Sequence, residues 1–268
     1  MVHGDDLTST RARAVLTIGT YDGVHLGHQR LIGLALDEGR RRGLRTIVVT
    51  FDRLPTEILR PQATPKLLTG LEHRLELLES THVDALRVLH FDLERAGESA
   101  EDFISGYLVD ELGADAIFVG ANFRFGHRAL GDVEMLQRLG GTYDYDVTGV
   151  ELLLDPATET AVSSTLIRRL VGEGKLRAAK DLLGRAHEVR GALVPDRRGV
   201  VVPGAFALPP AGKYDVAVGA PREDGVLATA TLLEVGPNAA EVLLSFSSLE
   251  GPLASARPGA AVAVRFIS

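Results

Sequence analysis

Short apolar runs alternate with longer stretches of helical spacing along the first half of the chain. The short runs are apolar or β-branched and predict buried strands at Ala14–Ile18, Thr46–Phe51, Ala85–Phe91 and Ala116–Val119. Apolar residues at helical spacing predict helices at Gln29–Arg42, Leu71–Ser80, Ala100–Leu112 and near Asp132–Leu139. Strands that alternate with helices indicate a parallel sheet covered by helices, so we predict an α/β fold here.

The pattern changes after about residue 192, where prolines and glycines become frequent. Short alternating runs follow, separated by turn signals, at Tyr214–Val218, Ala228–Leu233, Glu241–Phe246 and Ala261–Ile267. Such short strands are typical of a small β-barrel or sandwich. We therefore expect two domains: an α/β domain over residues 1–187 and a small β-barrel over residues 188–268.

Composition narrows the class of protein and its partners. The chain has 268 residues, of which 45% are hydrophobic and 24% charged, as in ordinary globular proteins. Its net charge of -7 argues against broad nucleic-acid binding, which normally needs a basic surface. The sequence holds no cysteine and no apolar stretch that suits a signal peptide or a membrane span. We expect a cytoplasmic protein with small-molecule substrates and neither nucleic-acid nor membrane partners, whose oligomeric state the sequence leaves open.

A glycine-rich segment, Gly19 to His28, joins the first predicted strand to the first predicted helix. Gly19 and Gly27 allow close approach of the backbone, and a helix N-terminus presents unpaired N–H groups to an anion. His25 and His28 are three residues apart, so both imidazoles face one side of the first turn and can donate hydrogen bonds to a polyphosphate. Surface or capping histidines are the alternative, but the position behind a first strand favours a phosphate site.

Four ordered motifs resemble one family. Gly19-Thr-Tyr-Asp-Gly-Val-His-Leu-Gly-His28 is similar to the Gly-x-Phe-Asp-Gly-Val-His-x-Gly-His of the FAD synthetase module of bacterial bifunctional riboflavin kinase/FAD synthetases. Val49-Thr-Phe-Asp52, Val119-Gly-Ala-Asn-Phe-Arg-Phe-Gly126 and Val162-Ser-Ser-Thr-Leu-Ile-Arg168 also resemble motifs of that module, in the same order. The resemblance implies a Rossmann-like nucleotidyltransferase domain that binds ATP and Mg²⁺ and adenylylates FMN to give FAD.

The same resemblance assigns roles to individual residues. It implies catalytic roles for His25, His28 and Arg168, and it leaves the metal ligands unassigned. The nucleotide-binding residues that it implies are Gly19, Tyr21, Asp22, Gly27, Asn122, Ser163, Ser164 and Thr165. The residues that it implies on the flavin or acceptor side are Phe51, Arg53, Phe123 and Phe125.

Simpler structural roles compete with several of these assignments. Ser163–Thr165 precede a predicted helix at Leu166–Val171, where hydroxyls commonly cap the helix. Phe123 and Phe125 would serve equally well in a hydrophobic core. Asp22 precedes a glycine, which is also a common turn pattern.

Two departures from the family pattern limit what the resemblance implies. The family's Asp-Pro-His-Pro is replaced by Asp52-Arg-Leu-Pro55, so Leu54 stands where a hydrogen-bonding histidine is expected and Arg53 offers a cation instead. In the second domain the kinase motif Phe-Pro-Thr-Ala-Asn-Leu is replaced by Val202-Pro-Gly-Ala-Phe-Ala-Leu208. Gly204 and Phe206 then occupy the Thr and Asn positions, and neither side chain offers the oxygen ligand that magnesium needs. Glu241 matches the family's catalytic glutamate, which is of little use without that metal site.

Three functions remain open on these grounds. The first is an FMN adenylyltransferase without riboflavin kinase activity, whose degenerate barrel is a structural partner. The second is a nucleotidyltransferase with a different phosphorylated acceptor, or with CTP as the donor. It is favoured by Leu54, which stands in place of the family histidine. The third is a catalytically silent flavin- or nucleotide-binding protein, which the intact His25 and His28 argue against.

Overall fold

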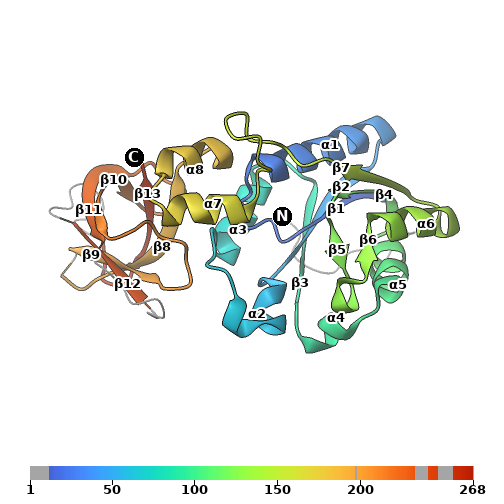
Figure 1. The fold of residues 1–268 in the computed structure, drawn as a ribbon, viewed down its shortest axis with the longest axis horizontal. Coiled ribbons are helices and arrows are strands. Elements are labelled where there is room, and N and C mark those ends of the chain that lie inside the picture. Colours follow the sequence, from blue (N-terminus) through green and yellow to red (C-terminus); the bar gives the residue numbers. More distant parts are fainter. Residues whose placement is uncertain (1–11, 197, 233–240, 247–255, 268) are drawn as a thin grey trace. The chain divides into compact units, whose positions relative to one another are not determined.

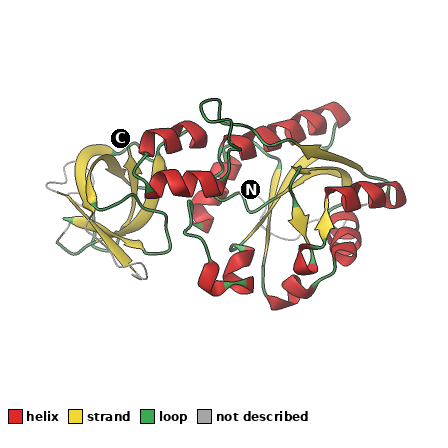
Figure 2. Cartoon of the chain, in the orientation of Figure 1, coloured by secondary structure: helices red, strands yellow, loops and turns green. Residues whose placement is uncertain are grey.

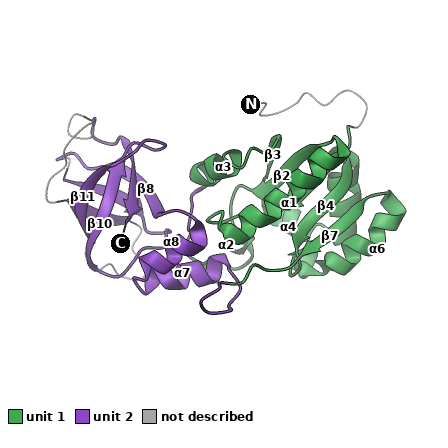
Figure 3. Cartoon of the chain, turned by 90° about the horizontal axis from the view of Figure 1, so that it is seen from above, with its two compact units in different colours: residues 1–65, 71–154 green, residues 66–70, 155–268 purple. Residues whose placement is uncertain are grey.

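The computed structural model describes residues 12–196, 198–232, 241–246 and 256–267. The chain divides into two compact units, one of Met1–Pro65 with Leu71–Leu154 and one of Lys66–Gly70 with Asp155–Ser268 (Figure 3). This division differs from the expected boundary at residues 187 and 188. Helices α7 (Ser164–Gly172) and α8 (Leu176–Leu183) fall in the second unit, together with the barrel strands.

The first unit is built on a five-stranded sheet in the order β3-β2-β1-β4-β7, and each pair of neighbours is parallel. Its strands are β1 (Ala14–Ile18), β2 (Arg45–Phe51), β3 (Ala85–Leu89), β4 (Ala114–Gly120) and β7 (Asp146–Val150). The predicted α/β class is therefore confirmed (Figure 1). Strand β7 was not predicted because its sequence, Asp-Val-Thr-Gly-Val, contains two residues that are rare in strands.

Helices join the strands of this sheet. The longer ones are α1 (Leu26–Arg42), α3 (Leu71–Glu79) and α6 (Val133–Tyr143). The shorter segments are α2 (Pro55–Leu59), η1 (Pro61–Ala63), α4 (Leu93–Gly97), α5 (Ala100–Asp102), η3 (His127–Ala129), β5 (Arg124–Phe125) and β6 (Gly131–Asp132). The helix predicted at residues 100–112 is α5 followed by a π-helix, η2 (Phe103–Glu111), in which the N–H of Leu112 donates to the carbonyl of Tyr107 at 3.0 Å.

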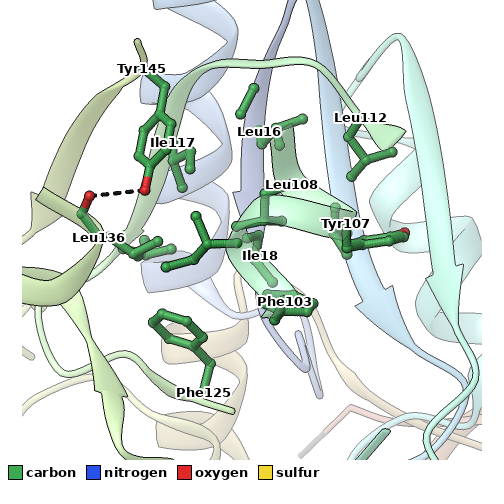
Figure 4. Packing of buried hydrophobic residues seen from close by; sticks show 14 of the residues in the cluster. Leu16, Ile18, Phe103, Tyr107, Leu108, Leu112, Ile117, Phe125, Leu136 and Tyr145 are labelled. Carbon is green, nitrogen blue, oxygen red and sulfur yellow. Dashed lines mark hydrogen bonds between the residues drawn. The ribbon is translucent and has the colours of Figure 1, made fainter. Parts of the chain in front are cut away.

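Both faces of the sheet are buried. Leu16 and Ile18 of β1 pack into one hydrophobic cluster with Phe103, Ile117 and other residues, as Figure 4 shows. Val15, which precedes Leu16 and points to the opposite face, belongs to a second cluster that includes residues of α1. Because successive strand residues point to opposite faces, a strand covered on both sides is apolar throughout, and this is the origin of the short apolar runs in the sequence.

The second unit contains a closed six-stranded barrel in the order β10-β11-β12-β9-β8-β13, which confirms the predicted barrel (Figure 2). Its strands are β8 (His187–Leu193), β9 (Gly199–Pro203), β10 (Gly212–Gly219), β11 (Val226–Leu232), β12 (Glu241–Phe246) and β13 (Ala261–Phe266). Strands β8 and β9 lie where prolines and glycines obscured the strand pattern. Leu233, the last residue of one predicted strand, lies outside the described residues. Within the part of the chain that the structure describes, no helix is long and apolar enough to cross a membrane.

Truncation of Ile117 tests this core. Ile117 is fully buried in β4, so Ile117→Ala should lower the free energy of unfolding by about 2–5 kcal/mol through lost burial and the cavity left behind. Val88 of β3 is 42% exposed, so Val88→Ala should change the free energy of unfolding by about 0.5 kcal/mol or less. Urea unfolding followed by circular dichroism measures both, and equal losses for the two variants would contradict the packing described here.

Candidate active site

The turn between β1 and α1 contains strained backbone (Figure 1). Tyr21, Gly23 and Val24 all have positive φ, at 49°, 84° and 39°. This conformation is uncommon for a tyrosine and costly for a β-branched valine. The turn is held in it by packing, because Tyr21 and Val24 are buried, and by a 2.6 Å hydrogen bond between the Tyr21 hydroxyl and Thr17 Oγ1. Strain of this kind persists only where the surroundings enforce it, and it gathers at functional sites.

Tyr21 holds the loop rather than presenting its ring. The ring is fully buried, and burial raises the pKa of the Tyr21 hydroxyl far above its ordinary value. A Cβ on Gly19 would lie 3.2 Å from that ring, so the glycine makes room for it. A phenylalanine could fill the same space, but the hydroxyl adds the bond to Thr17, which the sequence did not reveal.

His25 is the N-cap of α1. Its Nδ1 accepts a hydrogen bond from the N–H of His28 at 3.3 Å, and the residue is 5% exposed. Because Nδ1 is the acceptor, the proton of the neutral ring sits on Nε2, which is then a hydrogen-bond donor. The N–H groups of Leu26 and Gly27 lie in the first turn, where a helix offers no internal acceptor. Capping and anion binding are thus compatible at this helix end.

His28 stacks on His25, with ring centroids 3.6 Å apart, and meets the edge of Tyr21 at 5.1 Å. Its Nδ1 is sealed from solvent and has no hydrogen-bond partner among the residues that the structure describes. Burial, and secondarily the neighbouring His25, lower the pKa of His28 well below its ordinary 6.5. The ring is therefore neutral at pH 7, and His28 acts as a hydrogen-bond donor or acceptor rather than as a standing positive charge.

Asp52 organises the end of β2, where the sequence departs from the family. It accepts from the N–H of Phe91 at 3.0 Å and from Arg53 at 3.1 Å, and it contacts His90 Nδ1 at 2.7 Å. Burial would raise the pKa of Asp52, but these three donors outweigh it and the pKa lies below its ordinary value. Leu54 is 4% exposed, so the residue that replaces the family histidine belongs to the core.

The aromatic residues expected on the acceptor side lie on two elements. Phe51, at the end of β2, meets Phe91 edge-on at 5.7 Å, and Phe123 stacks on Phe125 at 5.4 Å. Phe125 belongs to the buried cluster shown in Figure 4, and Phe51 and Phe123 are partly buried against it. Core packing is thus one role of these rings. Asn122 is exposed in the loop after β4.

The remaining expected residues lie in the second unit. Ser163 is the N-cap of α7, and its Oγ accepts from the N–H three residues further on at 3.2 Å. Ser164 and Thr165 are the first two residues of that helix. Arg168 follows one turn later, and its Nε donates to the carbonyl of Lys66 at 2.6 Å. The hydroxyl of Ser163 is thereby used in capping, as the simpler alternative proposed.

The described residues offer few side chains that are placed to bind magnesium. Among the described residues, no group of three or more His, Asp or Glu side chains is arranged to hold a metal ion. Mg²⁺ commonly binds through one or two carboxylates and the phosphates of its nucleotide. The buried carboxylate of Asp22, inside the turn after β1, fits that limited role.

Two polar residues near the site, His90 and Arg74, were not predicted from the sequence. His90 directly follows β3 but was placed inside the predicted strand Ala85–Phe91. Arg74 lies in α3 and is 2% exposed. Its position gave a signal, because it is four residues before Leu78 and so falls on the apolar face of that helix.

A parallel sheet with a His-x-Gly-His turn between its first strand and first helix defines a Rossmann-like nucleotidyltransferase. The sequence model of the FAD synthetase family matches residues 7–166, which is more than half of the chain. The chain belongs to the FAD synthetase family.

Relatives of this chain carry the name of a bifunctional protein. The chain is 36% identical over 180 residues to the bifunctional riboflavin kinase/FMN adenylyltransferase of Escherichia coli K12, covering 67% of this chain and 57% of the relative. It is 31% identical over 189 residues to the protein of that name from Buchnera aphidicola subsp. Schizaphis graminum, covering 70% and 60%. The chain thus spans less than two thirds of the length of these relatives.

The fold is shared over a longer range. The crystal structure of a macrolide-efflux protein from Streptococcus pneumoniae superimposes with a TM-score of 0.80, covering 97% of this chain and 86% of that one. The identity is 24%, so this similarity shows the fold alone.

The neutral state of His28 predicts a pH dependence of stability. The unfolded chain protonates this histidine near pH 6.5, whereas the native ring resists protonation to a much lower pH. Below pH 6.5 the unfolded state therefore binds more protons than the native state does. As the pH falls, the free energy of unfolding decreases by up to about 1.4 kcal/mol per pH unit. Between pH 8 and pH 5, the free energy of unfolding of the wild type should fall by about 2 kcal/mol more than that of His28→Asn.

Chemical denaturation at each pH measures the difference. The exposed His82 provides the control, because His82→Asn should follow the wild-type curve. Parallel curves for the wild type and His28→Asn would show that His28 titrates normally in the native protein.

Proposed function

We propose that this protein transfers AMP from ATP to FMN, giving FAD and pyrophosphate. The observation that carries the proposal is the strained, buried turn that sets His25 and His28 at the N-terminus of α1. Family membership and the names of the relatives support the same reaction. Both substrates are small molecules, and no protein or nucleic-acid partner is needed for it.

In the proposed step a phosphate oxygen of FMN attacks the α-phosphorus of ATP. The new P–O bond forms as the bond from the α-phosphorus to the bridging oxygen breaks, and its electrons leave with pyrophosphate. No covalent enzyme intermediate is required, so catalysis rests on positioning and on stabilising negative charge. His25 Nε2, the neutral ring of His28 and the first N–H groups of α1 supply donors for the phosphates. Magnesium, bound with ATP, would neutralise phosphate charge.

We assign the start of α7 a second phosphate-binding role. Ser164 and Thr165 carry hydroxyls and lie in its first turn, where backbone N–H groups have no acceptor within the helix. The motif Val162–Arg168 matches the family, and Arg168 adds a planar cation.

We also propose that the barrel lacks riboflavin kinase activity. Gly204 and Phe206 replace the family's Thr and Asn. Other residues of the second unit contact the segment that contains them. The Lys66 ammonium donates to the Gly204 carbonyl, and the N–H of Leu67 donates to the carbonyl of Ala205 at 2.7 Å. The Phe206 ring lies so close to Gly70 that a Cβ there would be 3.3 Å away. A cation and an aromatic ring thus occupy this segment in place of magnesium ligands.

A second candidate keeps nucleotidyl transfer but changes the acceptor. The observation that favours it is the buried Leu54, because an apolar side chain replaces a hydrogen-bonding one at the end of β2. The exposed His90, held by Asp52, presents an imidazole at the neighbouring strand end instead. A different phosphorylated acceptor, or CTP as donor, would fit such a change.

A product assay separates these functions. Purified protein with Mg²⁺ and ATP is offered FMN or riboflavin, and products are resolved by chromatography. FAD from FMN, and no FMN from riboflavin, is the expected result. FMN made from riboflavin would overturn the loss of kinase activity. If neither flavin reacts, FMN adenylylation is wrong, and other phosphorylated acceptors with ATP or CTP become the test of the second candidate.

Substitution of His28 tests the mechanism. His28→Ala should lower kcat with FMN and ATP by about 10²–10³-fold, because a preorganised donor to the phosphates is lost. His82→Asn changes an exposed histidine of the same unit and should leave kcat unchanged. Unchanged turnover in His28→Ala would remove the histidine pair from the mechanism and leave a binding role.

A further inference from the structure

Arg74 is a buried cation that the proposed mechanism does not yet use. It lies near the start of α3 and is 2% exposed. Burying a guanidinium is costly unless fixed partners repay the lost hydration. Its partners in the first unit therefore indicate why it is there.

The guanidinium completes the hydrogen bonding of β2 beyond the end of β1. Arg74 Nη2 donates to the carbonyl of Phe51, the last residue of β2. The carbonyl of Val49 accepts from Gly19, just past the end of β1, at 3.1 Å. Because alternate residues of a parallel strand face the same neighbour, the carbonyl of Phe51 also faces the β1 side, where β1 has already ended at Ile18. Arg74 takes the place of the missing strand there.

The charge of Arg74 connects this strand end to the turn after β1. Burial lowers the pKa of Arg74, and the carboxylates of Asp22, Glu57 and Asp52 act against that shift, Asp22 most strongly. An arginine stays protonated at neutral pH even so. Asp22 is fully buried in the strained turn, so the guanidinium is a fixed positive charge beside that turn. The neutral His28 does not supply such a charge.

One donor of the guanidinium is left over. Arg74 Nε is sealed from solvent, and no described residue forms a hydrogen bond with it. A buried donor without a partner is unusual in a native protein and costs stability. A side chain retained only for stability would be expected to satisfy this group, so the arrangement favours a role in the reaction.

We propose that Arg74 is a positioning residue for adenylyl transfer, which fixes the carbonyl of Phe51 and the carboxylate of Asp22 relative to each other. Phe51 marks the acceptor side and Asp22 the phosphate turn, so this tie keeps the acceptor phosphate aligned with the α-phosphorus. The inference rests on the proposed function and adds a residue that none of the four family motifs contains.

Steady-state kinetics of three variants test the inference. Arg74→Met keeps the length of the side chain but removes its charge and donors. We expect the KM for FMN to rise about tenfold and kcat to fall about tenfold or more, because small misplacements of reactants are costly in rate. Arg74→Lys keeps the charge and a single donor nitrogen, and should recover part of both losses.

Arg42→Met is the matched control. Arg42 is an ion-paired arginine at the amino end of the same sheet, where it contacts Glu38 and Asp146 at 2.6 Å and Asp115 at 2.5 Å. Its loss should lower Tm while leaving the KM for FMN and kcat unchanged. A purely structural role for Arg74 would give the same pattern: a lower Tm with wild-type kinetic constants.

Each outcome decides the matter. A folded Arg74→Met with wild-type KM and kcat overturns the inference, and so does an equal KM change in Arg42→Met. If Arg74→Met does not fold, Arg74→Lys decides: a raised KM at unchanged Tm supports the role, and a wild-type KM overturns it. If the wild type makes no FAD, the proposed function fails. The rise of Tm on adding ATP then tests whether Arg74 positions Asp22 in the turn after β1. Loss of that rise in Arg74→Lys supports it, and an unchanged rise overturns it.

Discussion

The structure of the site depends on one constraint: the chain must turn from a fully buried strand into a helix within seven residues while keeping strained backbone at Tyr21 and Val24. Burial of both side chains and the bond from Tyr21 to Thr17 enforce that conformation. The turn then delivers His25 to the N-cap of α1 and stacks His28 on it. The proposed phosphate site is therefore preorganised, because the sheet and helix fix its donors before any ligand arrives.

The electrostatics of the turn follow from the same burial. Burial, and secondarily the neighbouring His25, keep the His28 ring neutral at pH 7 by lowering its pKa, so His28 offers hydrogen bonds rather than charge. Beside the turn, Arg74 contributes a positive charge, which is held by its bond to the end of β2 and favoured by the charges of three carboxylates. Neutral donors with a nearby arginine suit a reaction in which charge shifts from one phosphate to another, since they bind the anion without being titrated by it.

The two units have diverged to different degrees from the family pattern. The first retains the segment Gly19 to His28, with Tyr21 in place of the family's phenylalanine. It also differs at the end of β2, where Leu54 is buried and Asp52 contacts Arg53 and His90. In the second, the barrel remains closed although Gly204 and Phe206 replace polar residues. A barrel is stabilised by strand pairing and a filled interior, so its closure does not depend on the side chains at these two positions. This explains how the fold can match a known structure over nearly the whole chain.

The sequence by itself determined the α/β class, the barrel and the segment Gly19 to His28, because apolar periodicity and glycine spacing are local properties that survive without coordinates. It missed β7, β8 and β9, whose polar, glycine and proline residues give weak local signals although pairing with neighbours makes them strands. Only the tertiary structure decided that His28 is neutral, that Leu54 is buried, and that Arg74 bonds to the end of β2. Burial and charge depend on residues brought together from distant parts of the chain, and no local pattern records them.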